Sequence, residues 1–131
     1  MAKVAIVTDS VASIPEQHLS ELNIHVVAYY IHRGKEVLRD LVSIQREEFL
    51  TWLSTTRTLP TTASPGPGDY FNTYENLVKQ EGANEIISIH MTSKGSGAYQ
   101  APHSSTTSAK WVCRRRNCRI WSSSVVVSGT K

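Results

Sequence analysis

Three short apolar runs, each followed by small polar residues and a helical pattern, constrain the fold of this 131-residue chain more than any other feature. The runs cover residues 4–7, 24–31 and 85–89, and their β-branched side chains suit buried strands. Apolar side chains at helical spacing lie between the runs, for example over residues 70–78. This alternation predicts an α/β fold with a parallel sheet and helices on both faces.

Capping and turn residues predict the limits of the first elements. Ser13 and Glu16 have capping-box spacing, so a helix is expected to begin after Ser13 and to end at Asn23. Turn chemistry around Gly34 then predicts that residues 36–40 return as a short edge strand beside the run 24–31.

The next helix is expected over residues 45–53, with Ser43 as its cap. Its apolar side chains occupy more than one face, which predicts a cover beyond the sheet. Residues 55–68 are expected to form a loop, and Asp69 to open the helix that contains residues 70–78.

Hydroxyl groups gather where three of these segments end. Residues 86–100 begin as an apolar run and continue as a segment rich in serine and glycine. Residues 7–10 and 61–65 also place hydroxyls before a helix. In open parallel sheets, ligands bind at the carboxyl ends of the strands. Hydroxyls and helix-start amides there suit a carboxylate or a phosphate, although the same residue types are also ordinary caps and turn formers.

The net charge divides at residue 100. Residues 1–100 contain eight Lys/Arg and eleven Asp/Glu, a net charge of −3, whereas residues 101–131 contain six Lys/Arg and no acid, a net charge of +6. We therefore predict a domain over residues 1–100 and a basic, serine-rich tail over residues 101–131 that adds no helix or strand to it. Cys113 and Cys118 lie in this tail and do not require a disulfide, and neither a secretory signal nor an apolar span is recognisable. These features favour a cytoplasmic protein.

The segments VAIVTDS (residues 4–10), the threonine–proline loop and SKGSGAYQ (residues 93–100) together resemble the DegV family of bacterial fatty-acid-binding proteins. The three match in order and with similar intervals over residues 3–100. The resemblance implies one long-chain fatty acid, whose carboxylate is held at the strand ends by hydroxyl side chains. It implies no cofactor and no catalysis, since some members present the acid to a separate fatty acid kinase for phospholipid synthesis.

Carried over by motif, the lipid-binding residues are Ser10, Thr61, Thr62, Ser93, Ser96 and His90. Thr62 and Ser93 match the two hydroxyls that bond the carboxylate in the family. Two departures accompany the resemblance, since family members continue into a second domain and residues 101–131 do not resemble their continuation. A truncated or out-of-frame reading of a longer gene is the expectation that explains both.

The basic tail supports a competing function. Arginines 114–116, with Trp111 and Trp121 nearby, have the residue types that grip phosphates and stack on bases, so a small nucleic-acid-binding protein is the alternative. A basic tail with no binding role is the favoured interpretation of that segment.

Metal and enzyme interpretations find less support. The five histidines lack zinc-ligand spacing, and the serine–glycine segment lacks the order of a phosphate loop. A hydrolase would use Ser10 or Ser93 with His90 and Asp9, but no Gly-x-Ser-x-Gly elbow is present. Asp9 is instead expected to accept loop amides and hold the shape of the site.

Overall fold

The computed structural model describes residues 3–91, 100–105 and 119–125. A four-stranded sheet in the order β2-β1-β6-β7 organises the chain, built from β1 (Val4–Asp9), β2 (Ile24–Val27), β6 (Glu85–Met91) and β7 (Arg119–Val125). All three neighbouring pairs are parallel, so the predicted parallel sheet is confirmed.

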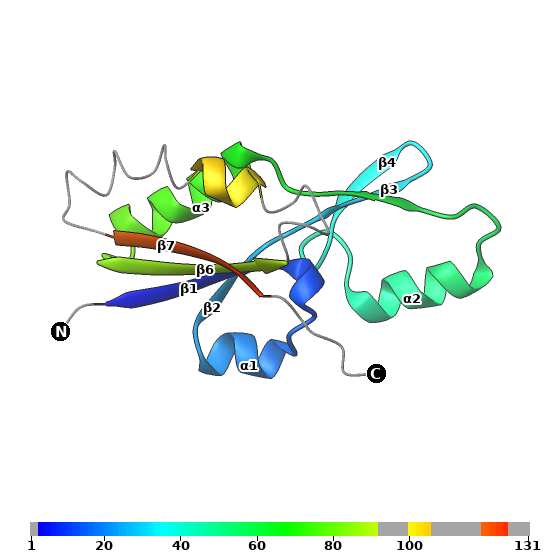
Figure 1. Ribbon diagram of the computed structural model, residues 1–131. Helices are drawn as coiled ribbons and strands as arrows, with labels where there is room; N and C mark the ends of the chain where they lie inside the picture. The colour runs from blue at the N-terminus through cyan, green and yellow to red at the C-terminus, as the bar shows by residue number, and fades with distance from the viewer. Residues whose placement is uncertain (1–2, 92–99, 106–118, 126–131) are drawn as a thin grey trace, which may run out of the picture.

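Helices cover this sheet on both faces, as predicted (Figure 1). Helix α3 (Pro67–Lys79) lies on one face with the helical residues 100–105, and α1 (Glu16–Glu21) lies on the other. The α3 side holds the core, where Tyr70, Tyr74 and Leu77 pack on Val7 and Ile86. Their burial follows from the helical spacing of apolar residues on α3.

A second, antiparallel sheet lies beside the first, in the order β4-β3-β5. It contains β3 (Tyr30–Arg33), β4 (Glu36–Arg39) and β5 (Thr61–Ala63), and α2 (Arg46–Thr55) runs next to it (Figure 1). The hairpin of β3 and β4 was predicted. By contrast, α2 has no buried residue, so the described residues do not supply the cover that its apolar side chains predicted.

The single strand predicted over residues 24–31 is wrong, because the run divides between the two sheets. The break falls at Tyr29, whose N–H donates to Ser10 Oγ (3.1 Å) and whose carbonyl accepts from Asp40 N (3.0 Å). These bonds replace the strand ladder at that point. The loop predicted over residues 55–68 also needs correction, since β5 lies inside it and pairs with β3.

Two predicted caps are wrong. Asp9 accepts from Val11 N (3.2 Å) and begins a short 3-10 helix, η1 (Ser10–Ala12), which Ser13 ends with φ 53°. Ser13 is thus used by the earlier turn, and α1 begins after Pro15 instead. In the same way Ser43 belongs to the turn after β4, where its N–H donates to Arg39 O (2.8 Å), and Gln45 precedes α2.

The prediction that no element follows residue 100 is also wrong for the described residues. Residues 100–105 are helical and contain the buried Pro102, and β7 pairs with β6 over seven register positions. The serine-rich sequence of β7 has little strand character of its own. It pairs with the edge of β6, which would otherwise be unpaired.

Candidate functional site

The carboxyl ends of β1 and β6 bring together Asp9, Ser10 and His90. All three are buried, with 2%, 2% and 3% of their surface exposed. Asp9 Oδ2 lies 3.1 Å from His90 Nδ1, while its other oxygen accepts from Val11 N. Parallel strands end at the same edge of a sheet, which is why residues 81 positions apart meet here. The predicted structural role of Asp9 agrees with this geometry.

A chain of hydrogen bonds continues from this pair into the core. His90 Nε2 lies 2.6 Å from Ser88 Oγ, which lies 2.7 Å from Tyr74 Oη. If His90 carries its proton on Nδ1, then Tyr74 donates to Ser88, Ser88 donates to His90 and His90 donates to Asp9. Every hydrogen in the chain then has an acceptor.

This chain leaves His90 no free ring nitrogen for a ligand. Asp9 occupies Nδ1 and Ser88 occupies Nε2. The sequence prediction included His90 among the residues that contact the lipid. The geometry instead gives His90 a positioning role, in which it holds Asp9 and through Asp9 the turn at Val11.

The histidine and aspartate of the hydrolase alternative, His90 and Asp9, are in contact, but the serine beside His90 is not one of the two that were predicted. Ser88, rather than Ser10, reaches the histidine, and none of its surface is exposed. The Ser88 hydroxyl is also paired on both sides, with His90 Nε2 and with Tyr74 Oη, so this Asp–His–Ser arrangement is part of the core. Ser93, the other serine of that hypothesis, lies outside the described residues.

Ser10 joins the two sheets. Its hydroxyl oxygen accepts from Tyr29 N at the point where the chain leaves β2 for β3. Beside it, Thr8 Oγ1 donates to Ile89 O (3.0 Å) and ties β1 to β6. Ser10 is itself buried, so within the described residues its hydroxyl acts as a structural acceptor at the crossing between the sheets.

Thr61 and Thr62 lie on β5, opposite His32 and Ile31 of β3, and both are exposed. Near β5, Tyr30 Oη donates to Asp69 Oδ1 (2.9 Å), and Asp69 Oδ2 accepts from Gly66 N at the start of α3. This brace fixes the second sheet against α3. Ser93 and Ser96 lie outside the described residues, so their predicted convergence with Thr62 stays a prediction.

Tyr70 is the residue at this site that sequence reasoning missed. Its ring meets the His90 ring edge-on, with centroids 5.1 Å apart, and none of its surface is exposed. Within the described residues its hydroxyl has no hydrogen-bond partner. Burial, and secondarily the charge of Asp9, raise its pKa well above the usual value, so the hydroxyl stays protonated. Its place in the apolar stripe of α3 marked it only as core.

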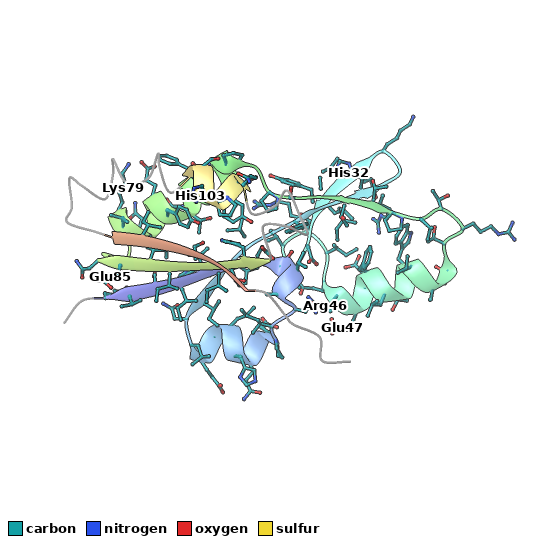
Figure 2. The ribbon with its side chains drawn as sticks, viewed as in Figure 1. His32, Arg46, Glu47, Lys79, Glu85 and His103 are labelled. Atoms are coloured by element: carbon teal, nitrogen blue, oxygen red, sulfur yellow. The ribbon has the colours of Figure 1, made fainter. Side chains whose placement is uncertain are left out.

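A groove of about 500 Å³ opens on the opposite face, between α1, β2 and the start of α2. Apolar side chains that include Ile14, Leu19 and Val26 line it, together with Arg46 and Glu47 at the start of α2, which are labelled in Figure 2. A smaller hollow continues toward Thr8, Asp9 and Ser10. Ile24, Val26 and Ala28 therefore help to line this groove, whereas the buried side chains of α3 lie in the core.

Two classes of site are not found in the part of the chain that the structure describes. No group of three or more His, Cys, Asp or Glu side chains is placed to hold a metal ion. No described helix is long and apolar enough to cross a membrane.

The fold and the strand-end cluster define an open α/β protein with buried polar groups at the carboxyl ends of its parallel strands. A family model described as "Uncharacterised protein, DegV family" matches residues 3–130. The chain belongs to the DegV family, as the sequence resemblance indicated.

Curated relatives share a part of their length with this chain. A DegV domain-containing protein from Halalkalibacterium halodurans is 40% identical over 101 residues, which are 77% of this chain and 35% of the relative. One from Caldanaerobacter subterraneus is 38% identical over 101 residues, with the same shares. The chain thus spans about a third of the length of these relatives.

Solved structures show the same fold. DegV from Bacillus subtilis, described as a fatty acid binding protein, is 26% identical with a TM-score of 0.77, and the match covers 92% of this chain and 40% of that one. A protein from Eubacterium ventriosum, described as binding stearic acid, is 22% identical with a TM-score of 0.73, and the match covers 94% and 41%.

Proposed function

We propose that this chain contributes the head-group end of a long-chain fatty acid site. The observation that carries the proposal is its likeness to Bacillus subtilis DegV, which is described as a fatty acid binding protein. The chain matches 40% of that structure, so the proposal concerns the part of the site that these residues form. Of the six predicted contact residues, we propose direct contact for Ser10, Thr61, Thr62, Ser93 and Ser96 and a positioning role for His90.

Neutral hydroxyls suit this ligand for a physical reason. An acyl tail contributes about 0.8 kcal/mol per buried methylene, so the head group needs orientation more than a strong charge partner. Asp9 would repel a bound carboxylate if its charge were unopposed. Its bonds to His90 and Val11 N compensate for that charge and leave room for hydroxyl donors.

Binding is tested by stripping lipid from the purified chain, reloading it with oleic acid and recording native mass spectra. The variant Thr62→Val keeps the shape of the side chain and removes its hydroxyl, whereas Thr51→Val makes the same change on α2, where the hydroxyl only bonds Glu47 O. We expect Thr62→Val to weaken binding about tenfold, the value of one hydrogen bond to a charged group, and Thr51→Val to leave it unchanged. Equal affinities for both variants would contradict the role of Thr62, and no uptake by the wild-type chain would contradict the function.

The second part of the proposal is that the chain presents the acid and does not transform it. A separate ATP-dependent kinase would transfer the γ-phosphoryl group to the carboxylate and give an acyl phosphate. Hydroxylamine converts acyl phosphates to hydroxamates, which provides the assay. We expect hydroxamate only when chain, acid, ATP and kinase are all present, and hydroxamate without the kinase would show that the chain itself is an enzyme.

A further inference from the structure

A buried hydroxyl without a partner marks an additional contact at the strand ends. Tyr70 Oη is fully buried, and no described group accepts its hydrogen or donates to it. Leaving such a group unpaired costs about 1–3 kcal/mol. A phenylalanine would fill the same space without this cost, so the hydroxyl needs a physical explanation.

The position of Tyr70 indicates what the partner is. The ring stands edge-on to His90, with centroids 5.1 Å apart, and His90 Nδ1 lies 3.1 Å from Asp9 Oδ2 at the end of β1. The hydroxyl therefore lies at the carboxyl ends of β1 and β6, where the proposed head group is expected. Asp9 itself is already bonded to His90 and Val11 N.

We propose that Tyr70 donates a hydrogen bond to the carboxylate oxygen of the bound acid, as a specificity residue beside the predicted serines and threonines. The inference rests on the proposed function and adds to it a donor that no motif indicated. A donor that stays neutral and protonated favours an acceptor-only group such as a carboxylate over an alcohol. The site should therefore discriminate between a fatty acid and the fatty alcohol of equal length.

The neighbouring tyrosine on the same helix face provides a matched control. Tyr74 is equally buried, but its hydroxyl is paired with Ser88. Tyr70→Phe and Tyr74→Phe thus remove the same atom from the same helix, one unpaired and one paired. Tyr70→Phe should therefore reduce affinity without reducing stability, whereas Tyr74→Phe should reduce stability without reducing affinity.

The experiment measures the affinity of the full chain and both variants for oleic acid and for oleyl alcohol, together with thermal unfolding. Tyr70→Phe should weaken oleic acid at least tenfold, weaken oleyl alcohol less and leave the Tm of the unliganded chain unchanged or higher. Tyr74→Phe should lower that Tm and keep both affinities.

Unchanged affinity of Tyr70→Phe for oleic acid, or an equal loss for acid and alcohol, would overturn the role of Tyr70 while the proposed function stands. Failure of the wild-type chain to bind oleic acid would instead remove the function on which the inference rests. If Tyr70→Phe does not fold, the wild-type chain labelled at tyrosine Cζ still gives the answer. The Tyr70 resonance must shift when oleic acid is added, and an unmoved signal counts against the inference.

Discussion

At the scale of single residues, a buried chain of hydrogen bonds between polar side chains connects the elements of the fold. Tyr74, Ser88, His90 and Asp9 come from three different elements and are joined by three successive hydrogen bonds. A group in the middle of such a chain has two neighbours that depend on it. Its removal therefore leaves two buried polar atoms unpaired.

Ser88→Ala should lower the free energy of unfolding by about 2–4 kcal/mol, because the Tyr74 hydroxyl and His90 Nε2 both lose their partner. Urea denaturation measures this change. Ser20→Ala is the control, since that hydroxyl bonds Glu16 O on the exposed face of α1 and its loss should stay within about 0.5 kcal/mol. A similar small effect for Ser88→Ala would mean that the buried chain does not stabilise the fold.

Tyr74 also predicts how stability depends on alkaline pH. Burial raises its pKa from 10.0 to about 12, and the bond to Ser88 opposes this rise only in part. The raised pKa favours the protonated folded state, so this contribution to stability is fully present below pH 10 and falls as the pH rises from 10 to about 12. Urea midpoints between pH 9 and 12 should decline less steeply in Tyr74→Phe than in the wild type, and identical slopes would contradict the prediction.

At the scale of elements, sequence patterns predict the helices and strands that local periodicity determines. They miss the strands whose limits or pairing depend on residues distant in the sequence. Strands β1 and β6 and helix α3 follow from their apolar periodicity, and so does the meeting of Ser10 and His90 at one sheet edge. The division of residues 24–31 does not, because the run is uniformly apolar and Ser10 and Asp40 impose the break from elsewhere. The same limit applies to β7, which pairs with the edge of β6.

Part of the candidate site could be predicted from the sequence. Residues that alternate along a strand share a face, so strand periodicity would place Ser88 and His90 on the same side of β6. The unpaired hydroxyl of Tyr70 was not predictable, because aromatic spacing on α3 shows only that the ring is buried. A missing hydrogen-bond partner is visible only in three dimensions.

Strand β7 leads to a prediction about the edge of the sheet. A chain that ends at residue 118 lacks β7 and exposes the backbone donors and acceptors of β6 on that side. We expect it to unfold at lower urea concentration and to self-associate in sedimentation experiments. A chain that ends at residue 125 retains β7 and is the control, and equal behaviour of the two would show that β7 does not support the sheet.

At the scale of the whole molecule, two sheets of different type share one continuous segment of chain. Figure 1 shows the two sheets side by side. The parallel sheet carries Asp9, Ser88 and His90, and the antiparallel sheet carries Thr61 and Thr62. The brace between Tyr30 and Asp69 connects the second sheet to α3. A ligand bound by hydroxyls from both sheets would therefore bind only when both sheets are folded and correctly placed.

Ligand binding should stabilise the chain as a whole. A fatty acid that binds only the folded state adds about 2.7 kcal/mol at a free concentration of 100 Kd. We expect oleic acid, kept below its micellar range, to raise the Tm in a concentration-dependent manner, and oleyl alcohol to raise it less. An equal rise with both compounds would indicate unspecific adsorption of the apolar tail.

The hydroxyl of Ser10 has a consequence for how this protein tolerates sequence change. It accepts the Tyr29 amide with its oxygen, which fixes the crossing from one sheet to the other, and in the proposed site its hydrogen would bond the ligand carboxylate. If the proposed function holds, one hydroxyl serves both the fold and the lipid site. Ser10→Ala would remove the hydroxyl and with it both hydrogen bonds. Ser10→Thr would keep the hydroxyl but add a methyl group at a buried position. Substitutions of Ser10 should therefore lower lipid affinity and stability together.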